Sequence, residues 1–485
     1  MKSITSCFAV LLLLLLPSVA SGNARLDPSF GKNGFATVHP PGSTSSWRYA
    51  LDVVEGRGGK LTTLVSGGPF SVARFSADGN PDRSFGADGF VSTKGSSIWG
   101  DRFATAGYGG ALGVTSEGGT VVAGLDTADP SGQNWTGDCA FIAQLLPNGK
   151  IDKSFARHGK RRTCLHRTSR RSRASSDAAS SVINLGSGST VGLSPASMDV
   201  TGSGKILVGG MVLSNWRDTG AFVARFNANG ALDRTFEGGP GSRSGERGIA
   251  EIRRRKDTEA DTFDVRSLRH RKVLAVGSYE RDLVVVRLNA KGFLDPGFGN
   301  LGIVKVKRRR LQPDDHYCYP TDASSAFDRR GRVVVAGTCW SDRTSDRSTY
   351  VLRLHKNGRL DRSFGNDGID SLRFNLDFSS SGVAIQRDGR IVVSGELGPH
   401  ISEGSNIPTR FALVRLTRNG TRDRSFFDRG LFTPKFTYEP GYPEPSGFKP
   451  RQLGHAATDV LIDRRGRIVA SGGDESPTLV RILPR

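Results

Sequence analysis

Residues whose types could do chemistry are sparse in this chain. The eight histidines show no HExxH or other metal-ligand spacing, and GxSxG nucleophile and phosphate-loop motifs are absent. Asp314, Asp315 and His316 form the one compact polar cluster, and its place beside Cys318 favours a solvated loop. The sequence therefore predicts no catalytic residue and no metal ligand.

Basic side chains give the chain a formal net charge of +21 and gather in three clusters. The clusters contain Lys160, Arg161, Arg162, Arg170 and Arg171, then Arg253, Arg254 and Arg255, then Lys307, Arg308, Arg309 and Arg310. A basic patch could hold an anionic cell-surface polymer, lipid headgroups or nucleic acid. Arginines on solvated loops are the simpler interpretation and the favoured one. Nucleic acid is disfavoured because no recognition motif is present and export would separate the chain from it.

Three tryptophans, Trp135, Trp216 and Trp340, follow apolar runs at comparable places in the chain. Aromatic rings in such connections could stack on sugars, although three unrelated packing positions are the more conservative interpretation.

The first residues have the pattern of an export signal. Lys2 precedes an apolar stretch from Phe8 to Leu16, and small residues from Ser18 to Gly22 follow it. The apolar stretch is too short to span a bilayer, and no later segment is long enough. We expect residues 1–24 to be a signal peptide, residues 25–485 to form one domain, and the product to be secreted or extracytoplasmic.

An internal repeat organises the rest of the chain. One tag occurs seven times, and its Asp residues 27 and 423 bound six intervals of about 66 residues each. The tag Asp and Phe pairs are Asp27 and Phe30, Asp82 and Phe85, Asp152 and Phe155, Asp233 and Phe236, Asp295 and Phe298, Asp361 and Phe364, and Asp423 and Phe426. The repeats span about 26–80, 81–150, 151–231, 232–293, 294–359, 360–421 and 422–485.

Each repeat predicts four short strands. The first follows the tag, as at residues 35–38; the second is half-apolar, as at 50–54; the third is an apolar run ending in Gly; and the fourth is a run such as SVARF. Turn signals such as Asp388-Gly389 separate the second and third strands. The pattern predicts an all-β, seven-bladed β-propeller of four-stranded blades.

A structural role is the favoured interpretation of the tag. Its Asp can accept hydrogen bonds from backbone N–H groups two or three residues on, and its Phe can be buried between neighbouring sheets. Seven copies make a catalytic role for each one implausible.

The tag, the preceding Asn-Gly turns and the VVAG-type runs resemble the bacterial delta-60 repeat, a β-propeller family of exported proteins with largely uncharacterised function. The resemblance covers nearly the whole chain after residue 24. It departs in repeat 4, where Glu237-Gly238 follows the tag Phe, and in repeat 7, where Phe427 replaces Gly. We expect those blades to be irregular and the blade count to survive.

Strand order predicts how the ring closes and where cysteines meet. Residues 35–38 should complete the last sheet beside residues 478–483, which removes the open edges. Register predicts disulfides pairing Cys318 with Cys339 and Cys139 with Cys164; a zinc site is the minor alternative, because no CxxC pair is present. Both bridges would lie on the face that carries the long connections, which we call the loop face, and the basic clusters should adjoin there.

Two functions remain open. The preferred one is a non-catalytic binding or scaffold propeller at the cell exterior, for an anionic polymer, a glycan or a protein partner. The alternative is a lactonase-like propeller hydrolase whose acids meet on the axis from separate blades. No cofactor is predicted, with an axial calcium ion left open, and we expect a monomer.

Overall fold

The computed structural model describes most of the chain after residue 23. The described residues are 24–38, 50–65, 71–92, 103–104, 110–126, 139–156, 159–166, 180–184, 190–214, 217–238, 247–252, 260–312, 318–341, 347–372, 374, 376–398, 409–434, 456–473 and 476–484.

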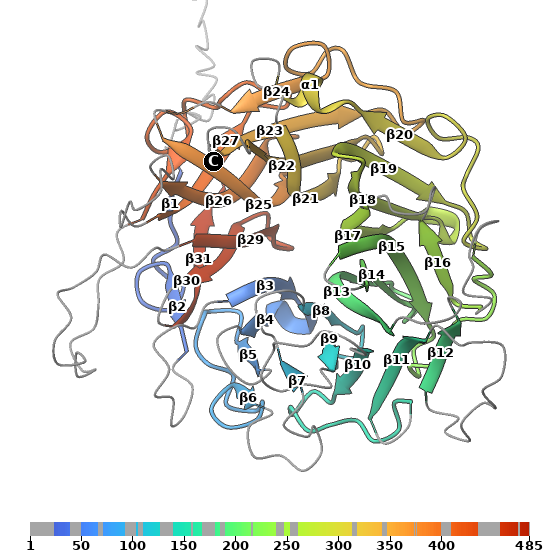
Figure 1. Ribbon diagram of the computed structural model, residues 1–485. Helices are drawn as coiled ribbons and strands as arrows, with labels where there is room; N and C mark the ends of the chain where they lie inside the picture. The colour runs from blue at the N-terminus through green and yellow to red at the C-terminus, as the bar shows by residue number, and fades with distance from the viewer. Residues whose placement is uncertain are drawn as a thin grey trace, which may run out of the picture.

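The strands form a seven-bladed β-propeller of four-stranded antiparallel sheets, which confirms the predicted fold (Figure 1). Blades 1 and 2 contain β3 (Ala50–Glu55), β4 (Leu61–Val65), β5 (Ser71–Phe75) and β6 (Phe90–Ser92), then β8 (Gly110–Val114), β9 (Thr120–Asp126), β10 (Cys139–Leu145) and β11 (Lys160–His166). Blades 3 and 4 contain β13 (Thr190–Val200), β14 (Ile206–Ser214), β15 (Arg217–Phe226) and β16 (Ile249–Ile252), then β17 (Ala260–Ser267), β18 (Val273–Tyr279), β19 (Asp282–Leu288) and β20 (Ile303–Val306). Blades 5 and 6 contain β21 (Cys318–Phe327), β22 (Val333–Ser341), β23 (Arg347–Leu354) and β24 (Ile369–Leu372), then β25 (Asp377–Ile385), β26 (Ile391–Gly398), β27 (Arg410–Leu416) and β28 (Leu431–Phe432).

The N-terminal strands complete the last blade, as the sequence predicted. Blade 7 contains β29 (Ala456–Ile462), β30 (Ile468–Gly473) and β31 (Pro477–Leu483). Beside β31 lie β1 (Arg25–Leu26) and β2 (Phe35–Thr37), with Phe35 opposite Val480 and Leu26 opposite Ile482. In Figure 1 the two ends of the colour scale meet there. This pairing covers the edge of β31 and closes the ring without a covalent bond.

Blades 2 and 3 are joined into one larger sheet, which the sequence did not predict. β11 pairs with β13 at Leu165 and Val191, and two additional strands, β7 (Phe103–Ala104) and β12 (Ser180–Asn184), extend blade 2. β13 pairs with β14 along residues 191–200, and its first residues also pair with β11 of blade 2. Among the described residues the only helical turns are η1 (Arg57–Gly59), η2 (Arg269–Arg271) and α1 (Arg308–Leu311).

Burial explains the two kinds of apolar pattern in each repeat. The innermost strand of a blade is only partly buried: in β3, Ala50 and Val53 are buried and the other residues are partly exposed, because one side faces the axis. The second strand is buried throughout, as in β4 and β30, because neighbouring blades pack on both of its faces. No described helix is long and apolar enough to cross a bilayer.

The tag builds a latch at the outer edge of each blade. In all seven copies the backbone N–H two residues after the tag Asp donates to its Oδ1 at 3.0–3.2 Å, and the tag Phe is at most 1% exposed. In six copies a buried or largely buried arginine of the third strand of the blade, such as Arg74 of β5, donates from Nε to the Asp Oδ2 at 2.7–2.8 Å. The same arginine stacks on the Phe ring. The six are Arg74, Arg225, Arg287, Arg353, Arg415 and Arg481.

The two irregular tags keep the fold. Phe427 occupies the glycine position of the last tag with a φ of +40°, and its ring packs on Phe426 and Phe432. In repeat 4 the Glu237 N–H donates to Lys291 O at 2.7 Å, the same link to the next blade that Gly365 makes to Asn419 O. The inter-blade hydrogen bond is therefore retained where the tag sequence departs.

Candidate functional site

The axis of the propeller holds a cavity of about 930 Å³. It is lined by the innermost strands, β3, β8, β13, β17, β21, β25 and β29, which we call the axial strands. A cavity of this size is in the range of small-molecule sites. Its lining combines aspartates and one arginine with small apolar residues such as Gly113 and Ala196.

A β-bulge lies at an equivalent position in six of the axial strands. The register shifts immediately before one residue in each of β3, β13, β17, β21, β25 and β29, whereas β8 pairs with β9 without a shift. The residues after the bulge are Asp52, Ser197, Asp264, Ser324, Gly382 and Asp459. A bulge bends a strand and redirects its side chains. Here it places polar residues from several blades around one axis.

The side chains after the bulge also join neighbouring axial strands. Asp459 Oδ2 accepts a hydrogen bond from Val53 N at 3.3 Å, and Ser197 Oγ accepts one from Val265 N at 3.2 Å. Asp264 Oδ2 accepts from Ser325 N at 2.8 Å and from the Ser325 hydroxyl at 2.5 Å. Each carboxylate is therefore held by the next blade, which fixes its position on the axis.

Asp52 and Asp459 form a carboxyl pair across the boundary between blades 1 and 7. The two carboxyl groups lie close enough for each to affect the pKa of the other. Burial raises the pKa of Asp52, and burial together with the negative charge of Asp52 raises the pKa of Asp459 well above its usual range. Two adjacent carboxyls in a low-dielectric site cannot both ionise readily, so the pair retains a proton to higher pH than a free aspartate.

Gly382 makes room for this pair. A Cβ at position 382 would lie 2.7 Å from Asp459 Oδ1 and 2.7 Å from Ser394 Oγ. Blade 6 therefore contributes no side chain after its bulge, and the carboxyl of Asp459 packs against the glycine backbone.

Arg266 is the cation of the cavity. Its Nε donates to Asp264 Oδ2 at 3.1 Å and to Ser325 O at 3.2 Å, and about a third of its side chain is exposed. Burial by itself would lower the pKa of Arg266, but the charges of Asp264, Asp199 and the carboxyl pair outweigh burial and raise it. Asp199 is itself held by Ser267 N at 2.6 Å. The guanidinium stays charged and offers its terminal nitrogens to the cavity as hydrogen-bond donors.

The cavity can supply donors and acceptors but shows no metal cage. Within the described part of the chain, no three His, Cys, Asp or Glu side chains are grouped so that they could hold a metal ion. The arrangement suits hydrogen bonding to a polar ligand and proton exchange at the carboxyl pair.

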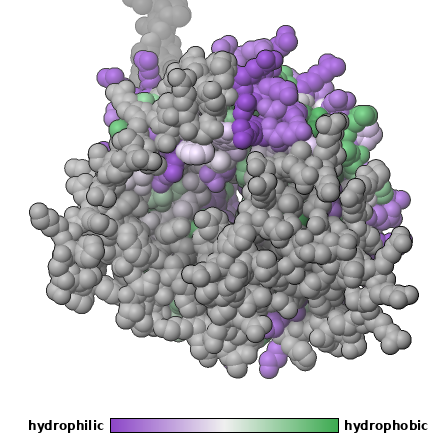
Figure 2. Space-filling view, viewed as in Figure 1, coloured by the Kyte–Doolittle hydropathy of each residue, from purple (hydrophilic) through white to green (hydrophobic). Residues whose placement is uncertain are grey.

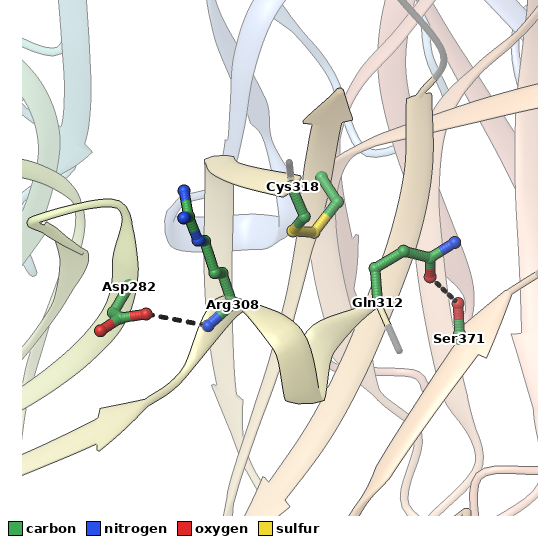
Figure 3. The surroundings of a disulfide bond; sticks show 6 residues. Asp282, Arg308, Gln312, Cys318 and Ser371 are labelled. Atoms are coloured by element: carbon green, nitrogen blue, oxygen red, sulfur yellow. Dashed lines mark hydrogen bonds between the residues drawn. A yellow bond between two sulfur atoms is a disulfide. The ribbon is translucent and has the colours of Figure 1, made fainter. Parts of the chain in front are cut away.

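Cys318 and Cys339 are joined by a disulfide with a Cα–Cα distance of 5.0 Å (Figure 3). The bridge ties the start of β21 to the end of β22, next to α1. Arg308 N there donates to Asp282 Oδ1 at 2.9 Å, and Gln312 accepts from Ser371 at 2.8 Å. β10 and β11 are paired, with Ala140 opposite Thr163, but the side chains of Cys139 and Cys164 are outside the described residues.

Only part of the predicted basic clusters can be placed. Lys160 and Arg161 lie in β11, and Lys307 donates to Asp282 Oδ2 at 3.0 Å. Arg308, Arg309 and Arg310 form α1, where hydrophilic side chains gather at the upper edge of the view in Figure 2. The Arg162 side chain, Arg170, Arg171, Arg253, Arg254 and Arg255 lie outside the described residues, so the predicted junction of the three clusters stays a prediction.

Of the three tryptophans, Trp340 lies on β22 and is 41% exposed. Its ring is 6.1 Å from that of Tyr319, on which Arg281 stacks at 4.5 Å. Trp135 and Trp216 lie outside the described residues, as do Asp314, Asp315 and His316. The polar cluster that the structure does assemble is the axial one, which the sequence did not single out.

A recurring dipeptide could have indicated the axial aspartates. Asp-Val occurs in four axial strands, at Asp52, Asp199, Asp264 and Asp459. Alignment of the second strand of each repeat would have shown acids repeatedly on the innermost strand. The bulges that turn them toward one axis are not visible in the sequence.

Four segments of the chain match one family model. It is described as "Domain of unknown function (DUF5122) beta-propeller" and matches residues 202–236, 271–298, 331–364 and 386–426. Each segment begins in the turn before a Gly-terminated apolar run and ends at a tag Phe. The match supports a β-propeller repeat family, and the delta-60 name stays a prediction. No curated protein matches the chain.

Several solved structures are distantly similar to this chain. A polysaccharide lyase of family PL25, an ulvan lyase, is 10% identical with a TM-score of 0.42, covering 95% of this chain and 94% of its own. The α-L-arabinanase of Penicillium chrysogenum is 10% identical with a TM-score of 0.40, covering 93% and 97%. The α-L-arabinofuranosidase Arb93A of Fusarium graminearum is 10% identical with a TM-score of 0.41, covering 80% and 98%. Likeness at this level concerns the fold and assigns no activity.

Proposed function

We propose that the protein is an extracellular binding propeller that takes a hydroxyl-rich ligand, a carbohydrate, in its axial cavity. The cavity volume of about 930 Å³ is large enough for a small sugar or the end of a glycan chain. The Cys318–Cys339 disulfide and the signal-like N-terminus support a place outside the cytoplasm.

One observation carries this proposal. The guanidinium of Arg266 lies in the same cavity as the proton-sharing pair of Asp52 and Asp459. Hydroxyl groups both donate and accept hydrogen bonds, so a site that offers cationic donors beside carboxyl groups suits a sugar better than a simple ion. The inter-blade hydrogen bonds of Asp264 and Asp459 hold this arrangement before any ligand arrives.

A calorimetric titration of neutral, acidic and amino oligosaccharides tests the proposal. We expect one class to bind, Arg266→Gln to weaken binding about tenfold or more, and Asp52→Asn to weaken it less, because the amide keeps one acceptor. Arg410→Gln removes the same charge at an exposed position on β27 and is the matched control. Equal affinity of the Arg266→Gln and wild-type proteins for every ligand that binds would reject the axial site.

The carboxyl pair favours glycoside hydrolysis as a second candidate. A carboxyl whose pKa is raised by burial and by a neighbouring carboxylate can act as a general acid, and a neighbouring carboxylate can accept a proton from water. In this alternative Asp459 would protonate the leaving oxygen, and a second acidic group would activate the water. Release of new reducing ends that Asp459→Asn abolishes would identify an enzyme; binding without turnover by the wild-type protein leaves the binding function.

A further inference from the structure

A second charged surface lies away from the axis, on the face that carries the short turns. We call it the turn face: it consists of the turn after each axial strand and the turn before each tag. A pocket of about 520 Å³ between blades 7 and 1 shows that these turns share one face. It is lined together by Ser29 of a tag, Gly58 and Arg465 of two post-axial turns, and Ala77 of a pre-tag turn.

Charges on the turn face are segregated by depth. Six of the seven tag carboxylates are buried and paired with arginine; Asp361, for example, is 3% exposed and binds Arg353 at 2.8 Å. Asp463, in the post-axial turn of blade 7, is 5% exposed and binds Arg467 at 2.6 Å. These carboxylates are therefore buried and neutralised by arginine, whereas other basic side chains of the turn face are exposed.

Seven of these surface cations lie over blades 5, 6 and 7. We call them the turn-face arc; within the described residues each is exposed and has no carboxylate partner. The arc consists of Arg329, Arg330, Lys356, Arg359, Arg418 and Arg465 in these turns, together with Arg424 of the adjoining tag. Exposed Asp388 lies between them but pairs with Arg390 at 2.7 Å. The arc therefore presents positive charge that no carboxylate of the described structure neutralises.

Hydrogen bonds between blades hold the arc in place. Arg387 Nη2 of blade 6 donates to Arg464 O of blade 7 at 2.6 Å. Arg353 of blade 5 donates to Arg418 O of blade 6. The tag residue Gly365 donates to Asn419 O at 2.8 Å. Short turns fixed in this way keep the cations apart at intervals set by the blades, which limits the entropy lost when a ligand binds.

We propose that the turn-face arc binds an anionic polymer, a polysaccharide bearing phosphate, sulfate or carboxylate groups. Arginine forks pair with such groups bidentately, and cations repeated from blade to blade fit charges repeated along a chain. This proposal is independent of the axial site.

The surroundings of the arc favour a polysaccharide over a membrane or a nucleic acid. The exposed large apolar side chains among the described residues are Leu146, Leu294, Leu301 and Trp340, and none lies in a turn of the arc. Peripheral membrane binding usually needs apolar anchors as well as charge. The described arc also lacks the aromatic side chains on which single-stranded bases stack.

The experiment measures binding of the full chain to heparin and to long-chain polyphosphate by fluorescence anisotropy over a range of salt concentrations. We expect affinity to fall steeply with salt, because bound polyanion displaces counterions. The variant Arg330→Gln/Arg418→Gln/Arg465→Gln should lose about tenfold or more in affinity and show a shallower salt dependence.

A charge-matched variant separates the arc from bulk charge. Arg25→Gln/Arg247→Gln/Arg410→Gln removes three exposed cations outside the arc and outside the basic clusters, and should bind as the wild type does. Equal loss in both triple variants, or no binding of either polyanion at low salt, would overturn the proposal. So would binding only to vesicles containing phosphatidylglycerol, or only to duplex DNA, since each would identify a different class of partner.

Discussion

Arg481 and Asp27 lie 454 residues apart in the sequence and form a buried ion pair, with Nε 2.8 Å from Oδ2. The Arg481 guanidinium also stacks on Phe30 at 4.1 Å and donates to Ala77 O of blade 1. In blades 1 to 6 the tag follows the third strand of the same blade, whereas for blade 7 it is supplied by the N-terminus. The same latch that links neighbouring blades elsewhere closes the ring here.

Loss of the charge on Asp27 should destabilise the protein strongly. Asp27→Asn keeps the acceptor for Ser29 N but leaves Arg481, which is 2% exposed, without its counter-charge. We expect a loss of about 3 kcal/mol in the free energy of unfolding by chemical denaturation. Asp152→Asn is the matched control, because its partner in blade 2 is the neutral Gln144. Similar losses in the two variants would contradict a role for the buried ion pair.

Removal of the N-terminal strands should open the ring. Deletion of residues 25–40 takes away β1, β2 and the first tag, which leaves the edge of β31 unpaired. We expect a clear fall in the melting temperature and concentration-dependent association through the free edge. An unchanged melting temperature of a monomeric truncated protein would show that closure by these strands contributes no stability.

The axial carboxyl pair should make the folded protein less stable as pH rises. Because the folded-state pKa of Asp459 is raised, its contribution to stability is complete below the unfolded pKa of about 4 and is lost as pH rises through the folded pKa. Asp459→Asn imitates the protonated state, so we expect a higher melting temperature than wild type at pH 7.5 and a difference that shrinks toward pH 4.5. A lower melting temperature at pH 7.5 would show that the pair is ionised without cost.

Asp361→Asn is a control for which the pH dependence of stability should be reversed. Burial would raise the pKa of Asp361, but hydrogen bonds from Ser363 and the charge of Arg353 outweigh burial and lower it. Its contribution is therefore present above pH 4 and is lost as pH falls through the folded pKa. The variant should be destabilised at pH 7.5, with a smaller deficit in acid.

The disulfide should contribute measurably to stability. Cys318 and Cys339 are separated by 21 residues, and a bridge over such a loop is worth about 3 kcal/mol. We expect Cys318→Ser/Cys339→Ser to lower the free energy of unfolding by that amount. Peptide mapping without reduction should recover the Cys318–Cys339 pair and tests the predicted Cys139–Cys164 pair at the same time. Recovery of Cys318 linked to Cys139 or Cys164 would contradict this assignment.

Gly395 and Gly472, which end the apolar runs RIVVSG and RIVASG, have a specific steric role. A Cβ at Gly395 would lie 2.0 Å from Ser379 O, immediately before the bulge of β25, and one at Gly472 would lie 2.1 Å from Ala456 O before the bulge of β29. We expect Gly395→Ala to cost about 2 kcal/mol in thermal or chemical unfolding, because backbone must move. Gly202→Ala meets no atom within 4 Å and should be neutral. A neutral Gly395→Ala variant would mean that the bulge is adaptable.

The sequence by itself determined the repeat, the number of blades and the closure of the ring. These follow from local chemistry that recurs seven times: an Asp that accepts from its own turn, a Phe that must be buried, and apolar runs of strand length. It also placed Cys318 near Cys339, because residues across a hairpin are fixed by the turn between them.

Only the tertiary structure decided which polar residues meet. Asp52 and Asp459 are separated by nearly the whole chain, and they adjoin because the ring brings blade 7 against blade 1. Arg266 joins them because a bulge in β17 redirects its neighbours toward the axis. A bulge is a change of register by one residue that leaves composition and periodicity almost unaltered, so sequence patterns reveal the strand and not the direction of its side chains.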